Sequence, residues 1–225
     1  MADDLARLEE ISSLLGTRVP AGFVPKCEGF LEELLKWNRR MNLMSQADES
    51  RLVARHVLDS LCVLSVVPGL SGKRIVDVGT GAGFPGVVLA LWAPDAEIIL
   101  VESRAKKVAF LNAIRRSLSL ANVGVLGSRA EELASSGSLR GTADLVVVRG
   151  VGKTARLTAS LLELIKPDGA VLFYCSARSC RTAGRSRELP ATRTGAEGPG
   201  PVMEYRTPAW QTLTSLAVLR KRRTS

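Results

Sequence analysis

The residues most able to do chemistry lie in the stretch IVDVGTGAGFPGVVLA, residues 75 to 90. Asp77 stands two residues before Gly79, the first glycine of a glycine-rich turn that continues to Gly86. Glycines let a backbone adopt positive φ angles and approach a ligand closely. An apolar run comes before this turn and another follows it. We therefore predict a strand, a turn and a helix that together hold a nucleotide-like ligand.

Two familiar ligands can be tested against this turn. A nucleoside triphosphate requires G-x-x-x-x-G-K-[ST], and residues 75 to 90 contain no lysine. A later Gly152-Lys153-Thr154 does not fit either, because Val147 stands where the first glycine should be. A dinucleotide such as NAD fits better. Residues 81 to 86 spell G-x-G-x-x-G, and an acid, Glu102, follows about 20 residues later. These residues by themselves do not exclude NAD as the ligand.

The elements that must position this turn follow a regular order from residue 73 onward. Short apolar runs alternate with helical patterns, and such runs indicate a parallel sheet covered on both faces. We predict an α/β, Rossmann-like fold with a seven-stranded, mainly parallel sheet, closed by an antiparallel pair at one edge. The expected strands are residues 73–79, 96–102, 122–128, 143–149, 169–176, 202–206 and 211–220.

Helical periodicity precedes the sheet, with helices expected at residues 3–15, 26–43 and 48–66. Pro68-Gly69 then closes this section. We predict an N-terminal helical extension and one larger domain that carries the glycine turn. The expected ranges are 1–70 for the extension and 71–225 for the domain, with a mobile loop at 177–200 and a basic tail at 220–225.

Charge and cysteine usage restrict the class of protein. The chain has a net charge of +9, and residues 178–225 carry ten Lys and Arg against three Glu, which favours a polyanionic partner. The four cysteines have neither disulfide-framework nor zinc spacing. The sequence contains no run of about 18 apolar residues, so we expect no membrane-spanning helix. The acidic N-terminus does not resemble a signal peptide. We expect a cytoplasmic protein without metal.

From Asp77 onward, the pattern Asp-x-Gly-x-Gly-x-Gly resembles motif I of the class I S-adenosylmethionine methyltransferases. The resemblance implies that the loop passes under the methionine end of the cofactor, near Gly81. It places Asp77 beside the cofactor's amino group, and it makes Glu102 the acceptor for two ribose hydroxyls. A charge at the end of a buried strand is costly without a partner, which agrees with these roles.

Other segments make the resemblance more specific. From residue 30 to about 172 the chain is similar to the ribosomal RNA small subunit methyltransferase G family. Its most specific segments are Gly-x-Gly-x-Gly-Phe-Pro-Gly and Arg-His-x-Leu-Asp-Ser-Leu. In this sequence the matching positions include Trp37-Asn38, Arg55-His56, Asp59-Ser60, Asp77 to Gly86, Glu102-Ser103, Lys106-Lys107, Arg129 to Glu132 and Asp144 to Arg149.

The family implies transfer of a methyl group from S-adenosylmethionine to N7 of a guanine in 16S rRNA, in a hairpin loop near the decoding centre. By position, it implies cofactor contacts at Gly79, Phe84, Ala130, Glu131 and Arg149. The implied partner is 16S rRNA, in the small ribosomal subunit or its precursor, and we expect a monomer.

Guanine N7 has a lone pair and no proton to lose, so its methylation requires alignment more than a base. We therefore assign no catalytic residue, and keep His56 and Arg149 as candidates for orientation. The alternatives are a methyltransferase with another RNA target, an NAD(P)-dependent oxidoreductase and a non-catalytic RNA-binding relative. The chain departs from the family at Val148-Arg149-Gly150 and at Tyr174-Cys175-Ser176, where Ser-Arg-Ala and Lys-Gly are usual.

Overall fold

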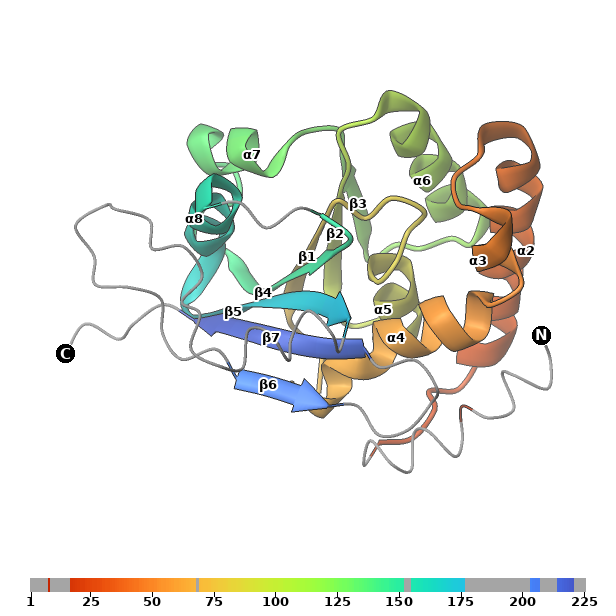
Figure 1. The fold of residues 1–225 in the computed structure, drawn as a ribbon, viewed down its shortest axis with the longest axis horizontal. Coiled ribbons are helices and arrows are strands. Elements are labelled where there is room, and N and C mark those ends of the chain that lie inside the picture. Colours follow the sequence, from red (N-terminus) through yellow and green to blue (C-terminus); the bar gives the residue numbers. More distant parts are fainter. Residues whose placement is uncertain are drawn as a thin grey trace.

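The computed structural model describes residues 8, 17–67, 69–151, 155–176, 203–206 and 214–220. Most of the helix expected at residues 3–15 lies outside these ranges, as do the loop expected at 177–200 and the tail beyond Arg220. The described residues contain the glycine turn and every strand that borders it (Figure 1).

A single mixed sheet has the strand order β3-β2-β1-β4-β5-β7-β6. The first five of these strands run parallel, and β7 and β6 are antiparallel to their neighbours. The predicted α/β class with a mainly parallel sheet and an antiparallel edge is confirmed. The strands are β1 (Arg74–Val78), β2 (Glu97–Val101), β3 (Val123–Leu126), β4 (Ala143–Arg149), β5 (Ile165–Ser176), β6 (Met203–Arg206) and β7 (Thr214–Arg220).

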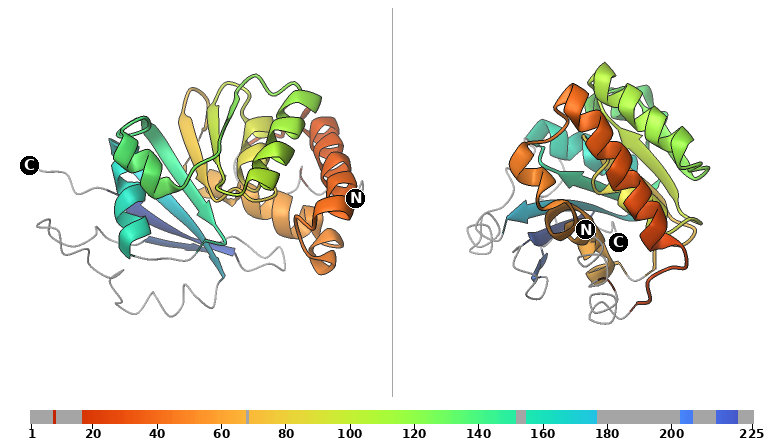
Figure 2. Two further views of the ribbon diagram at one scale, coloured as in Figure 1. Left: turned by 90° about the horizontal axis from the view of Figure 1, so that it is seen from above. Right: turned by 90° about the vertical axis from the view of Figure 1, so that its right-hand side faces the viewer.

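Helices cover both faces of the sheet. One face carries α7 (Ala130–Ser136) and α8 (Ala155–Leu164). The other carries α5 (Gly86–Trp92) and α6 (Ala105–Ser117). Outside these two, α2 (Phe23–Met41) packs against both and adds a further layer, which Figure 2 shows from above.

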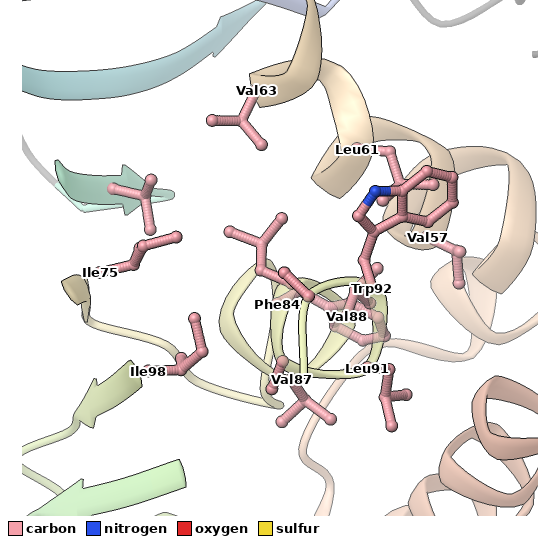
Figure 3. Close-up of a cluster of buried hydrophobic side chains, with 14 of the residues drawn as sticks. Val57, Leu61, Val63, Ile75, Phe84, Val87, Val88, Leu91, Trp92 and Ile98 are labelled. Atoms are coloured by element: carbon pink, nitrogen blue, oxygen red, sulfur yellow. The ribbon is translucent and has the colours of Figure 1, made fainter. Parts of the chain in front are cut away.

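Two buried clusters result because successive strand residues point to opposite faces. In β1, Ile75 belongs to the cluster beneath α5, whereas Val76 belongs to the cluster beneath α7 and α8. Figure 3 shows α5 between Ile75 and Ile98 of the sheet and Leu61 of the N-terminal section. Because α5 is buried along its whole length, the turn before it has a rigid support.

The helix expected at residues 48–66 is interrupted. It consists of α3 (Gln46–Glu49), a π-helical segment at Leu52–Val57, α4 (Leu58–Leu61) and a 3-10 turn at Cys62–Ser65. The break lies at Arg51, whose φ of −126° and ψ of 23° are not helical. The buried apolar residues of 17–67 share one cluster with α5 and α6, so this section rests on the sheet domain.

Candidate functional site

Asp77 connects the two ends of the glycine turn. Its side chain is fully buried, and Oδ2 accepts a hydrogen bond from the Gly86 amide at 2.7 Å. A Cβ at Gly86 would lie 2.6 Å from that oxygen, so only glycine fits there. Burial raises the pKa of Asp77 to about 6. The carboxylate therefore ties the end of β1 to the start of α5.

A cavity of about 290 Å³ lies at the carboxyl ends of β1, β2 and β3 and beside α7. Four of the residues expected to hold the cofactor contribute to its wall: Gly79, Glu102, Ala130 and Glu131. Its position is the one where open α/β sheets bind ligands, since the strand order reverses between β1 and β4. Its volume is near the lower end for ligand pockets. The cavity suits one part of a nucleoside cofactor.

Gly79 forms the cavity wall with bare backbone. Its φ is +73°, which disfavours any residue with a side chain. A Cβ at this position would also collide with Cγ2 of Val151, which follows β4. Conformation and space both require glycine, and this allows a ligand to approach the chain directly.

Glu102 directly follows β2 and is 8% exposed. Its Oε1 accepts a hydrogen bond from the Arg104 amide at 2.9 Å, which fixes the carboxylate at the cavity wall. A carboxylate held in this way can accept hydrogen bonds from a diol.

The start of α7 is fixed by a capping interaction. Glu132 Oε2 accepts from the Arg129 amide at 3.0 Å and from Ser128 Oγ at 2.7 Å. The hydrogen bond from the Arg129 amide lowers the pKa of Glu132, because it stabilises the ionised carboxylate. Ala130 and Glu131 are thereby held at the cavity wall.

Arg149 ends β4 and belongs to a second group of residues, which we call the Arg149 cluster: Asp48, Arg55, His56, Asp59, Phe84 and Arg149. Arg149 Nη2 donates to the Arg55 carbonyl at 3.1 Å and to His56 Nδ1 at 2.7 Å. It also lies 3.9 Å from Asp59 Oδ2. Burial lowers the pKa of Arg149 below its usual value, although the group remains a cation.

His56 is held on several sides within this cluster. Its Nε2 lies 3.6 Å from Asp48 Oδ1, and its ring centre lies 5.0 Å from that of Phe84. Burial, together with the nearby charge of Arg149, lowers the pKa of His56 to about 4. The imidazole is therefore neutral near pH 7.

Phe84 faces the N-terminal section. Its ring packs against Phe30 of α2, with centroids 5.3 Å apart, and against His56. It is absent from the cavity wall, as are Asp77, Gly81 and Arg149. The structure thus divides the predicted site residues into four at the cavity, Asp77 beneath the turn, Gly81 within it, and His56, Phe84 and Arg149 in the Arg149 cluster.

Sequence reasoning missed several residues of the cavity wall. Ser103 and Ser128 follow β2 and β3, and the rule that ligands bind at strand ends could have found them. Val151 follows β4 in the same way. Leu157 comes from α8, and no local pattern indicates it. Tyr174 stands at a position where the chain departs from the family. Its hydroxyl donates to the Ser60 carbonyl at 2.9 Å and joins β5 to the N-terminal section.

Within the described ranges, none of the helices has the length and apolar character to cross a membrane. The same ranges contain no group of three His, Cys, Asp or Glu side chains arranged for a metal ion. Cys27 and Cys62 are both buried. The side chain of Cys175 lies outside the described residues.

The chain matches the family model described as rRNA small subunit methyltransferase G over residues 24–193. Curated relatives with that name are similar over most of the chain. The relative from Sorangium cellulosum is 39% identical over 166 residues, covering 73% of this chain and 69% of the relative. That from Halorhodospira halophila is 38% identical over 167 residues, covering 74% of each. The relative from Desulfitobacterium hafniense is 36% identical over 149 residues, covering 66% of this chain and 61% of the relative.

Solved structures resemble the fold at low identity. A SAM dependent methyltransferase from Aquifex aeolicus has a TM-score of 0.54 at 18% identity, covering 85% of this chain and 98% of that one. A 16S rRNA (adenine(1408)-N(1))-methyltransferase from Catenulisporales acidiphilia has a TM-score of 0.50 at 19% identity, covering 68% and 88%. At these identities the likeness concerns the fold alone.

Proposed function

The chain belongs to the rRNA small subunit methyltransferase G family, and on that premise we propose that it transfers a methyl group from S-adenosylmethionine to N7 of a guanine in 16S rRNA. One observation carries the proposal: three segments that are far apart in the sequence meet at one cavity. They are the glycine turn at Gly79, Glu102 after β2, and Ala130-Glu131 at the start of α7.

The residues at the cavity suit the nucleoside part of this cofactor. Glu102 is a buried carboxylate with a fixed orientation, and it would accept hydrogen bonds from the two ribose hydroxyls. Ala130 and Glu131 would border the adenine, and Gly79 would let the cofactor lie against bare backbone. When bound, S-adenosylmethionine supplies an electrophilic methyl group on a sulfonium. Gly81, Phe84 and Arg149 would complete the site from the direction of the Arg149 cluster.

We propose that Asp77 acts mainly through the turn. Its Oδ2 is bonded to the Gly86 amide, and its side chain is fully buried. This arrangement supports a role in holding the turn in shape. Direct contact between Asp77 and the cofactor's amino group stays a prediction, and an Asp77→Asn variant separates the two roles.

The proposed reaction needs no general base, since N7 attacks with its own lone pair. His56 is poorly placed for proton abstraction. Its Nδ1 already accepts from Arg149, and in the neutral ring the other nitrogen carries the proton. The chain's contribution is alignment of the two reactants.

We propose that the substrate is 16S rRNA within the small ribosomal subunit or its precursor, and that the protein acts as a cytoplasmic monomer without a membrane partner. The net charge of +9 supports a polyanionic partner. The family's name supports the small subunit.

The direct test is methylation of small-subunit RNA that lacks the modification, as free RNA and as assembled subunit, with cofactor labelled in its methyl group. Mapping should find the label at N7 of one guanine. Label on another atom, or none in either substrate, would contradict the proposal. Calorimetry provides a second test, in which S-adenosylhomocysteine should bind and NADH should not. Tighter binding of NADH would favour an oxidoreductase.

A further inference from the structure

Three groups from the N-terminal section surround the Arg149 guanidinium, although about 90 residues separate them from it in the sequence. They are the Arg55 carbonyl at 3.1 Å, His56 Nδ1 at 2.7 Å and Asp59 Oδ2 at 3.9 Å. The side chain of Arg149 is only 18% exposed. A cation in such a place requires acceptors, and the N-terminal section supplies them.

The contact with His56 determines the state of the imidazole. Arginine can only donate, so Nδ1 must be the acceptor. The neutral ring then carries its proton on Nε2, which lies 3.6 Å from Asp48 Oδ1, just beyond hydrogen-bond distance. The charged groups that face the ring are Arg149, Asp48 and Arg55. Two of the three are cations, and the ring is largely buried, so the uncharged form is favoured.

One donor of Arg149 is left over. Nη1 is buried and has no hydrogen-bond partner among the residues that the structure describes. A buried donor of a charged group is costly to leave unpaired. Gly150 and Val151 follow Arg149 directly, and Val151 forms part of the cavity wall. Arg149, which carries the unpaired donor, thus lies two positions before a residue of the cavity wall.

We propose that His56 is a positioning residue, which as a neutral imidazole with its proton on Nε2 holds the Arg149 guanidinium so that Nη1 is available to the cofactor. The inference rests on the proposed function for the identity of the ligand. His56 also contacts the glycine turn, because its ring packs on Phe84, which belongs to that turn. One residue of the N-terminal section thereby touches both the turn and the end of β4.

Nuclear magnetic resonance tests the state of the imidazole directly. His56 is the only histidine, so untagged protein labelled with ¹⁵N gives a single set of ring signals. We expect the pattern of a neutral ring with Nε2 protonated, unchanged from pH 8 down to about pH 5. A ring that is protonated at Nδ1, or one that titrates above pH 6, would overturn the proposal without reference to any activity.

A pair of substitutions tests the effect on the ligand. His56→Asn keeps an acceptor near the position of Nδ1, whereas His56→Phe keeps an aromatic ring against Phe84 and removes the acceptor. Calorimetry with S-adenosylhomocysteine should show about a 10-fold or greater loss of affinity for His56→Phe, as for a hydrogen bond to a charged group. His56→Asn should retain the affinity of the unaltered protein within about threefold. Full affinity in His56→Phe, with a loss in His56→Asn, would mean that His56 acts only through packing and would overturn the proposal.

A double-mutant cycle shows whether His56 acts through Arg149. In an Arg149→Gln background, His56→Phe should weaken binding of S-adenosylhomocysteine by less than about twofold. A loss as large as in the unaltered background would overturn the positioning role. If S-adenosylhomocysteine does not bind the unaltered protein, the cofactor assignment fails, and the ring signals still decide whether His56 has the expected state.

Discussion

The cavity and the Arg149 cluster lie at the same edge of the sheet and are constructed differently. At the cavity, each key side chain is fixed by a neighbour in sequence: Glu102 by the Arg104 amide, and the start of α7 by Glu132. In the Arg149 cluster, the partners come from the N-terminal section, and His56 and Arg149 are 93 positions apart. Local contacts thus fix the side chains of the first region, whereas tertiary contacts fix those of the second.

This difference has a functional consequence. A cavity whose side chains are fixed by local contacts depends mainly on the backbone of the sheet domain. The Arg149 cluster depends on how the N-terminal section docks on α5 and α6, so changes in that section can reach the site. Substitutions at the cavity should therefore affect the ligand directly, and substitutions in the cluster should act through the docked section.

The largest effect is expected for Gly79→Ala, compared with Gly137→Ala. The two glycines have φ angles of +73° and +75°, so backbone strain is matched. Only at Gly79 would a Cβ collide with a neighbour, Val151, whereas nothing lies within 4 Å at Gly137. Gly79→Ala should weaken binding of S-adenosylhomocysteine at least about 1,000-fold, and Gly137→Ala should cost only about 1 kcal/mol of stability. Calorimetry and thermal unfolding measure the two. Similar losses of affinity would remove the distinction between cavity and scaffold.

The second effect is on stability and involves Asp77→Asn. The pKa of Asp77 is about 6 in the folded protein against 3.8 ordinarily, so the folded state binds more protons between these values. Ionisation there destabilises the fold. As pH rises from 4 to 7, the unaltered protein should lose up to about 3 kcal/mol relative to Asp77→Asn. Chemical denaturation at several pH values measures the difference, and the exposed Asp95→Asn is the control.

The same Asp77→Asn variant distinguishes the two roles of this residue. The amide oxygen of asparagine can still accept from Gly86, so a role through the turn predicts a loss of affinity for S-adenosylhomocysteine of less than about 10-fold. Complete loss of binding in a folded variant would instead indicate direct contact with the cofactor.

Much of the fold and of the cavity could be predicted because the causes are local. Apolar runs that alternate with helices indicated the parallel sheet, and the glycine spacing with Glu102 indicated the edge of the sheet at which the cavity lies. The family resemblance added Ala130 and Glu131. Each of these positions directly follows a strand or begins a helix, so its place in space follows from the topology alone.

The Arg149 cluster could not be assembled in this way. His56 and Arg149 were both candidates for orientation, but no periodicity or spacing shows that two residues 93 positions apart share a hydrogen bond. Phe84 was expected to contact the cofactor, and its ring packs on Phe30 and His56. The direction of that side chain depends on how α2 docks, which is a tertiary property. Its contact with the cofactor stays a prediction.

The third effect compares two carboxylates at the two ends of β2, the buried Glu102 and the exposed Glu97. Glu102→Gln keeps the shape of a side chain that is 8% exposed but removes its charge. Affinity for S-adenosylhomocysteine should fall about 10- to 100-fold, as for a hydrogen bond to a charged acceptor. Glu97→Gln removes an exposed carboxylate that pairs with Arg74, and it should leave affinity unchanged. If both variants bind equally well, Glu102 is not a cofactor ligand.

The smallest effect concerns Lys107, which lies near Gly81 of the glycine turn. Its Nζ comes within 3.5 Å of the place that a Cβ on Gly81 would occupy, so the ammonium stands over the glycine turn. If the methionine end of the cofactor lies there, Lys107 faces its carboxylate. Lys107→Gln should weaken S-adenosylhomocysteine binding by about fivefold or less, because the group is partly exposed. Methylthioadenosine, which lacks the amino acid, should bind both proteins equally. Lys106→Gln, at an exposed position, is the matched control. Equal weakening for both ligands would mean that Lys107 acts on the nucleoside part of the cofactor and not on its methionine end.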